Sequence, residues 1–330
     1  MATSRQFFPG IHALRAIAAT FVVIQHAGFA AKDYFVFGYD IDNDYFVWGR
    51  VGVILFFAIS GFVIALHRAR PVGIFVVHRL LRIYPTYWLA MILAAAATAA
   101  LQQPVVTGLS SILLYPAATS ISTLWIPYWT LAYELTFYTL AAAVFLLRLS
   151  DRTLTILALL WIAAVNLFAN NPTDIEYELP GRSILLSAAV QVFPMGLICG
   201  IHFERFKRAG RWPYLVACVI TFAGSMPLQE LTVIKLLMHG ISSCCLILAI
   251  ADIDIRSRVV ELLGNASYGI YLMHFPAMMF AAAVSPSHGI FWFFALGMAS
   301  GTLYGLFDHW LYRRMTVQMA KPFPPMEFRK

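Results

Sequence analysis

Ten apolar segments, each about as long as a lipid bilayer is thick, follow one another along the 330 residues of this chain. A helix needs about 20 apolar residues to cross the hydrocarbon core. Apolar residues make up 61% of the sequence and charged residues only 12%, too few to cover the surface of a soluble fold of this size. The segments cover, roughly, residues 11–30, 47–67, 79–101, 127–148, 153–170, 182–203, 212–228, 232–251, 266–284 and 290–312.

This pattern predicts an all-α polytopic membrane protein with about ten transmembrane helices. It excludes a disordered protein, a nucleic-acid-binding domain and an ordinary soluble enzyme. The sequence contains no internal repeat and no low-complexity linker, so residues 1–330 are expected to form a single transmembrane domain. Residues 108–116 are a short amphipathic stretch, which we expect to lie in the membrane interface.

Basic residues are distributed unevenly between the two sides of the membrane. With the N-terminus in the cytoplasm, 18 of the 23 Lys and Arg residues fall on the cytoplasmic side. The opposite side holds Lys32, Arg50, Arg182 and Lys235, and Arg15 lies at the edge of the first span. Because Lys and Arg concentrate in cytoplasmic loops, both termini are predicted to be cytoplasmic in a multi-pass membrane protein. The net charge of +7 then reflects topology and contacts with membrane lipids, not nucleic-acid binding.

Two ionisable side chains share the first span. Arg15 and His26 are eleven residues apart, which places them on one face of a helix and about 16 Å apart along its axis. If Arg15 marks the cytoplasmic boundary, His26 lies near the midplane of the bilayer. An imidazole there is either a hydrogen-bond donor between packed helices or a general base in a polar cavity, because imidazole titrates near neutral pH.

Three further charges lie inside or at the edge of spans. Arg79 and Arg82 are one turn apart at the start of the third span, where two guanidinium groups on one face suit phosphate oxygens. Taken alone, the two arginines are more typical of an anchor that binds lipid headgroups. Glu134 could pair with an arginine, orient His26 or form a purely structural ion pair, since a charge within a span needs a partner.

The remaining polar positions give weaker indications. His274 is about two turns into the ninth span and could line the same cavity, whereas an interfacial position accounts for Asp308 and His309 near the cytoplasmic end of the last span. All four cysteines fall in apolar runs without a Cys-x-x-Cys spacing, so neither a zinc site nor a disulfide framework is indicated, and no metal is expected.

Five motifs, in order and over about residues 11 to 312, resemble those of the acyltransferase-3 family of integral membrane acyltransferases. They are Arg15 and His26 with ten residues between them, the Leu-Phe-Phe-Ala-Ile-Ser-Gly-Phe run at 55–62, Arg-Leu-Leu-Arg-Ile-Tyr-Pro at 79–85, Trp-Thr-Leu-Ala-Tyr-Glu with Phe-Tyr at 129–138, and Ser-Tyr-Gly-Ile-Tyr-Leu-Met-His at 267–274. Residues 85–88 and 129–131 are most similar to the exopolysaccharide-acetylating branch of that family.

The resemblance implies transfer of an acyl group, commonly acetyl, from acyl-CoA to a hydroxyl of a surface or exported polysaccharide or its lipid-linked precursor. His26 would be the general base, and Glu134 would set its tautomer or balance its charge. Arg15, Arg79 and Arg82 would bind the anionic CoA. A carbohydrate acceptor and other proteins of polysaccharide biosynthesis are the implied partners, and the implied location is the bacterial cytoplasmic (inner) membrane. The chain is about as long as the family's membrane domain alone, so the resemblance also implies that no soluble domain is appended. Residues that could line the substrate cavity are Ser60, Trp129, Tyr138 and His274.

Two positions depart from the family pattern, which often has acids where this chain has His12 and Ile54. If an acid from the second span normally assists the histidine, Glu134 has to do more of that work here. The main alternative function is a secondary transporter or flippase of a glycan or small polar metabolite, whose sequence sign would be paired, interrupted helices in the two halves. A second alternative is a relative without activity that only binds a biosynthetic partner.

Overall fold

The computed structural model describes residues 8–31, 48–68, 71–116, 122–171, 181–229, 231–285 and 287–319. Within these ranges the chain is helical, without β-strands, and one isolated bridge joins Thr107 to Ser122. The helices are α1 (Pro9–Ala31), α3 (Trp48–Leu66), α4 (Val72–Ala100), α5 (Leu109–Leu113), α6 (Tyr128–Leu146), α7 (Asp151–Phe168), η1 (Gly181–Leu186), η2 (Ala188–Gln191), α9 (Val192–Ile201), α10 (Phe203–Lys207), α11 (Trp212–Ser225), α12 (Val233–Ile250), α13 (Arg258–Val284) and α14 (Ile290–Met319).

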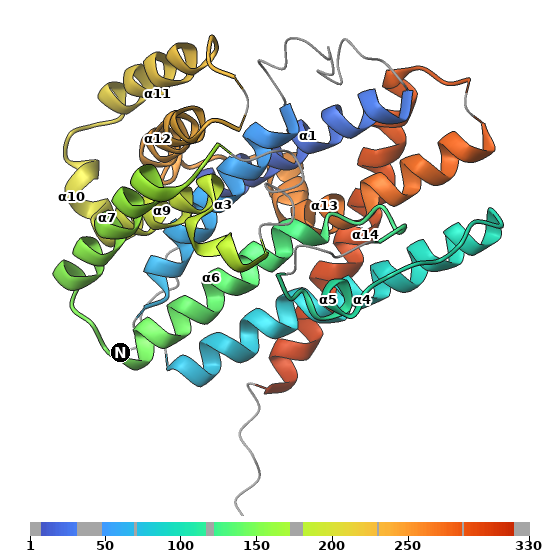
Figure 1. Cartoon of the computed structure of the whole chain (residues 1–330), viewed down its shortest axis with the longest axis horizontal. Helices are drawn as coiled ribbons and strands as arrows, with labels where there is room; N and C mark the ends of the chain where they lie inside the picture. Colours follow the sequence, from blue (N-terminus) through green and yellow to red (C-terminus); the bar gives the residue numbers. More distant parts are fainter. Residues whose placement is uncertain are drawn as a thin grey trace, which may run out of the picture.

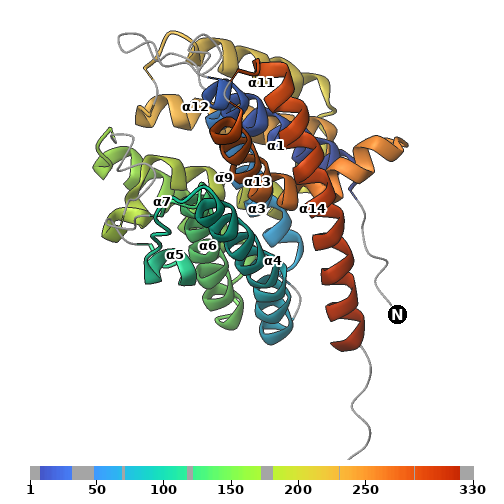
Figure 2. The ribbon, with the colours of Figure 1, turned by 90° about the vertical axis from the view of Figure 1, so that its right-hand side faces the viewer.

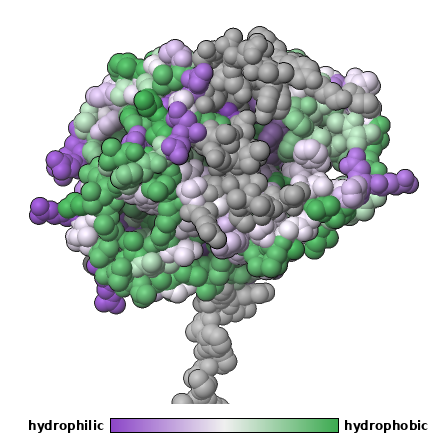
Figure 3. Space-filling view, viewed as in Figure 1, coloured by the Kyte–Doolittle hydropathy of each residue, from purple (hydrophilic) through white to green (hydrophobic). Residues whose placement is uncertain are grey.

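Eight of the described helices are long and apolar enough to cross a membrane: α1, α3, α4, α6, α7, α12, α13 and α14. Two shorter apolar helical stretches, Ala188–Ile201 and Trp212–Ser225, occupy most of the other two expected spans. The expectation of an all-α polytopic membrane protein is therefore confirmed. The number ten and the cytoplasmic location of the termini stay predictions. Large apolar side chains cover much of the face in Figure 3, as a surface in contact with lipid requires.

The segment expected as one span over residues 182–203 is not one continuous α-helix. It consists of the 3₁₀ segments η1 and η2, followed by the short α9. Pro194 accounts for where α9 begins, because proline lacks an N–H and is tolerated within the first turn of a helix but not in its interior. At the other end of the chain, α14 continues to Met319, beyond the expected limit at 312, so that a polar stretch extends the helix past its apolar part.

Contacts between distant segments bring the basic ends of several helices together. Phe8, just before α1, packs against Phe62 of α3 and Phe203 of α10, with ring centroids 5.7 and 5.5 Å apart. Ion pairs join Arg68 to Asp151 at 2.9 Å and Lys207 to Asp252 at 2.7 Å. The beginnings of α1 and α7 thus lie with the ends of α3, α10 and α12. We call this side of the molecule the basic end. Lys32, assigned from the sequence to the opposite side, lies outside the described residues.

Small residues let neighbouring helices approach to backbone contact, as is common in membrane proteins. A Cβ atom at Gly269 of α13 would come within 2.2 Å of the Cα of Gly305 in α14. The same holds between α3 and α9, where a Cβ at Gly61 would lie 2.1 Å from the carbonyl oxygen of Phe193. Figures 1 and 2 show α13 and α14 side by side in both views. The close α13–α14 crossing fixes the second half of α14 beside α4.

Candidate functional site

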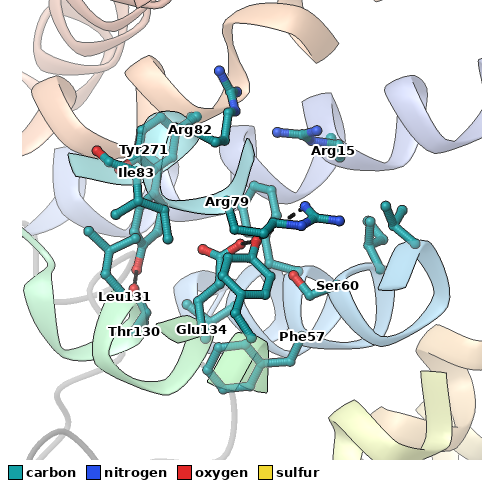
Figure 4. A pocket seen from close by; sticks show the side chains of 16 residues that line it. Arg15, Phe57, Ser60, Arg79, Arg82, Ile83, Thr130, Leu131, Glu134 and Tyr271 are labelled. Carbon is teal, nitrogen blue, oxygen red and sulfur yellow. Dashed lines mark hydrogen bonds between the residues drawn. The ribbon is translucent and has the colours of Figure 1, made fainter. Parts of the chain in front are cut away.

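A cavity of about 110 Å³ lies between α1, α3, α4, α6 and α13. Its polar lining includes Arg15, Ser60, Arg79 and Glu134, which Figure 4 shows converging on one space. Arg15 is six residues into α1 and Arg79 is seven residues into α4, so both lie about 10 Å along the helix axis from the basic end. The remaining lining residues are Val53, Phe56, Phe57, Ile59, Val63, Arg82, Ile83, Thr130, Leu131, Tyr138, Tyr268 and Tyr271.

Arg79 is held by aromatic rings of the cavity wall. Its guanidinium carbon lies 4.8 Å from the ring centroid of Tyr138 and 5.2 Å from that of Phe75, and a guanidinium N–H points to the Tyr138 hydroxyl at 3.5 Å. The Tyr138 hydroxyl in turn donates to a carboxylate oxygen of Glu134, one helical turn earlier in α6. Tyr138 thus links the cation of Arg79 to the anion of Glu134. This arrangement turns the guanidinium into the protein, not toward lipid headgroups.

Arg15 projects into the same cavity from α1. Its Nε–H donates to the Ser267 hydroxyl of α13 at 3.1 Å, and Ser267 donates to the carbonyl oxygen of Gly264 at 2.8 Å. Among the described residues, no carboxylate lies within ion-pair distance of Arg15 or Arg79. Two guanidinium groups without a bound carboxylate in a small cavity form a strong site for an anion, because Arg donates several hydrogen bonds and stays charged.

Arg82 differs from the other two arginines because its charge is already compensated. One of its guanidinium nitrogens lies 2.6 Å from a carboxylate oxygen of Asp308, and Thr86 donates to the other oxygen at 3.0 Å. Asp308 is only 1% exposed, because it packs inside the helix bundle against Arg82 and Thr86. Burial follows from the close α13–α14 crossing, which carries Asp308 inward against α4. In Figure 4 the Arg82 side chain points away from Glu134.

His26 is placed outside the cavity lining and pairs with another histidine. Its Nδ1 lies 2.7 Å from Nε2 of His274, whose Nδ1 lies 2.6 Å from the carbonyl oxygen of Ile270. The ring of His26 also stacks on Phe275, with centroids 4.1 Å apart and planes 13° apart. The sequence singled out both histidines but gave no reason to pair them, because they are 248 residues apart.

One aromatic ring of the cavity wall, Tyr271, lies next to His274 of the histidine pair. Phe56 and Tyr271 both line the cavity and pack edge to face, with centroids 5.8 Å apart. The ring centroid of Tyr271 lies 6.3 Å from that of His274, and its hydroxyl is 2.6 Å from the Thr130 hydroxyl. Tyr271 therefore connects the cavity wall to His274, and Phe56 packs beside Tyr271. We call Phe56 and Tyr271 the aromatic layer.

Other candidate positions are also placed by the structure. Ser60 and Tyr138 line the cavity, but Trp129 does not, and it packs edge to face against Tyr133. Ile54, where an acid was expected from the resemblance, is fully buried in the apolar core. Asp308 and Thr86 were not among the site residues predicted from the sequence. A charged residue inside a span that lacks an obvious partner would have been the signal for Asp308.

Comparisons with known proteins give two matches. The family described as "Acyltransferase domain" (acyltransferase-3) matches residues 8–307. A curated protein, the exopolysaccharide production protein ExoZ of Rhizobium meliloti (strain 1021), is 29% identical over 321 residues, which cover 84% of this chain and 92% of that protein. No solved structure gives a significant match.

Proposed function

Because this chain belongs to the acyltransferase-3 family, we propose that it transfers an acetyl group from acetyl-CoA to a hydroxyl of an exported polysaccharide or its lipid-linked precursor. A membrane acyltransferase is what the family match and the eight apolar helices establish. The printed name of the Rhizobium relative supports exopolysaccharide as the acceptor class. We place the protein in the bacterial inner membrane, with the basic end and both termini in the cytoplasm.

The observation that carries the proposal is the pair of guanidinium groups, Arg15 and Arg79, that line one cavity near the basic end and form no direct ion pair with a carboxylate among the described residues. CoA is a polyanion made in the cytoplasm, and its phosphates suit fixed guanidinium donors better than ammonium groups. Its narrow thioester-bearing arm would run from these arginines toward the aromatic layer. Arg82 supports this site indirectly, because its ion pair with Asp308 holds α4 and α14 together beside the cavity.

In the proposed reaction His26 is the general base. It takes the proton of the acceptor hydroxyl while the hydroxyl oxygen attacks the thioester carbonyl carbon. The tetrahedral intermediate then collapses, the C–S bond breaks, and the CoA thiolate takes the proton from His26. On the path that we propose for the thioester, the carbonyl passes Phe56 and Tyr271, so these two rings would move aside in the productive complex. No acyl-enzyme is formed.

The test measures transfer of radiolabelled acetyl from acetyl-CoA to polysaccharide in inverted membrane vesicles of the producing cells. His26→Ala should lower the rate at saturating acetyl-CoA by about 10²-fold or more. Arg79→Ala should raise the KM for acetyl-CoA about tenfold or more, because one charge-assisted contact is worth about 1.5–3 kcal/mol.

Arg148→Ala is the matched control for the arginine, because Arg148 is an exposed basic residue at the end of α6. It should leave both kinetic constants unchanged. A wild-type rate in His26→Ala would refute the proposed role of the histidine. Uptake of a glycan by sealed vesicles without acetyl-CoA, with no label transferred, would instead favour the transporter.

A further inference from the structure

The hydrogen bonds around His274 define where the protons of the histidine pair lie. The Ile270 carbonyl oxygen can only accept a hydrogen bond, so Nδ1 of His274 carries a hydrogen and donates it. A neutral His274 then has an unprotonated Nε2, which must accept. The atom facing it at 2.7 Å is Nδ1 of His26, so that nitrogen carries the hydrogen of the neutral His26 ring.

This order of protons leaves Nε2 of His26 without a hydrogen. Nε2 makes no hydrogen bond to any described residue, and His26 is only partly buried. His274, by contrast, is fully buried among apolar side chains of α1, α13 and α14, including Val23, Met278 and Phe293. Burial in apolar surroundings favours the neutral form of His274, which is the form that this hydrogen-bond order requires.

We propose that His274, anchored on the Ile270 carbonyl, is the positioning residue that holds His26 in the tautomer with a bare Nε2, the nitrogen that takes the acceptor's proton. The inference rests on the proposed function and replaces the role in setting the tautomer that the sequence suggested for Glu134. The Glu134 carboxylate is engaged with Tyr138, at the cavity, and has no contact with His26 among the described interactions.

The stacking contact makes the arrangement directional. The hydrogen bond to His274 fixes one edge of the His26 ring, and Phe275 covers one of its faces at a centroid distance of 4.1 Å. The only ring nitrogen that remains for a ligand is therefore Nε2, on the edge away from His274. A hydroxyl approaching that edge meets a lone pair in a fixed direction, as general-base catalysis requires. When His26 takes the proton, its Nδ1–H remains bonded to Nε2 of His274.

The decisive experiment compares His274→Met, which fills similar space but offers no strong acceptor, with His274→Gln, which keeps an oxygen acceptor near the position of Nε2. In His274→Met we expect the rate of acetyl transfer at saturating acetyl-CoA to fall between about 10²- and 10⁴-fold, with an unchanged KM for acetyl-CoA. His274→Gln should recover at least tenfold of that loss. If His274 only packed between helices, the rate would not fall at an unchanged KM, and His274→Gln would not recover activity over His274→Met.

A second measurement does not depend on activity. The ¹⁵N NMR spectrum of histidine-labelled protein in lipid nanodiscs, with the His26 signals assigned by His26→Gln, should show a protonated Nδ1 and an unprotonated Nε2. In His274→Met the Nε2-protonated tautomer should gain population. A proton on Nε2 in the wild type, or an unchanged His26 tautomer in His274→Met, would overturn the inference.

The two proposals fail in different ways. A wild-type protein that transfers no acetyl group refutes the proposed function before any variant is made, and with it the catalytic use of Nε2. A wild type that transfers acetyl while His274→Met keeps its rate refutes the role of His274 alone. Folding of both variants is checked by thermal unfolding of the purified protein.

Discussion

At the residue scale, the three arginines near the basic end are not equivalent. Arg15 and Arg79 face the cavity without a carboxylate among their described ion-pair partners, whereas Arg82 is paired with the buried Asp308. Their spacing on the helix cannot distinguish Arg79 from Arg82, because the difference comes from α14, more than 200 residues away in sequence. Because the buried carboxylate of Asp308 pairs with its guanidinium, the charge of Arg82 stabilises the fold and is not left for a ligand.

Asp308→Asn should therefore destabilise the protein strongly, because it leaves the charge of Arg82 in the interior uncompensated. Breaking a buried pair costs about 3–5 kcal/mol. Asp151→Asn is the control, since it breaks the pair with Arg68, in which the two side chains are 50% and 34% exposed. That change should cost less than about 1 kcal/mol. The free energy of unfolding is measured by SDS titration in mixed micelles, and equal losses in the two variants would contradict a structural role of Asp308.

The residues of the cavity could be selected from the sequence to a considerable extent. Arg15, Arg79 and Glu134 stood out because charged groups in apolar spans are costly, whereas Ser60 and Tyr138 came from the family resemblance. The structure places all five at one cavity. The sequence could not show which partner each would take. The bond between His26 and His274 depends on how α1 packs against α13, and helical periodicity within either segment carries no information about that.

At the scale of elements, small residues allow neighbouring helices to pack with their backbones in contact. The crossing of α13 and α14 is set by Gly269 and Gly305, where a side chain would overlap the opposite backbone. The long helices could be predicted because each is a sustained apolar run. The pieces η1, η2 and α9 could not, because apolar composition alone does not report the place where Pro194 restricts the start of a helix.

Gly269→Val should force α13 and α14 apart, because its Cβ would lie 2.2 Å from the Cα of Gly305. Overpacking of this kind costs about 1–3 kcal/mol, and the midpoint of thermal unfolding should fall by about 5 °C or more. The control is Gly73→Val, since a Cβ at Gly73 of α4 meets no atom within 4 Å. Fluorescence-detected size exclusion after heating gives both midpoints. An unchanged midpoint for Gly269→Val would show that this crossing tolerates a side chain.

At the scale of the whole molecule, the basic end makes the two ends of the helix bundle different from each other. The ends of α3, α10 and α12 and the beginnings of α1 and α7 meet there through Phe8, Arg68 and Lys207. The cavity opens among residues about two helical turns from this end. The sequence could predict that basic residues gather at one end, because the Lys and Arg bias is read from the loops between spans and does not depend on how the helices pack.

Cysteine labelling tests which side the basic end faces. In a variant without the four native cysteines, Ala209→Cys lies between α10 and α11 at the basic end, and Val105→Cys lies after α4 at the opposite end, both at exposed positions. A membrane-impermeant maleimide should label the cysteine at 105 in intact spheroplasts and the one at 209 only after lysis. The reverse pattern would place the arginines of the cavity on the side away from the cytoplasmic pool of CoA.

The aromatic layer has a consequence for how the cell's activated acetate is used. Tyr271 lines the polar cavity and lies 6.3 Å from His274 between ring centroids, and Phe56 packs against it, so these two side chains stand between a ligand beside Arg15 and His274. Under the proposed function, a thioester can wait among the arginines without being hydrolysed. Acetyl-CoA is then consumed only when a glycan is bound, and the enzyme without a glycan does not hydrolyse the cell's acetyl-CoA.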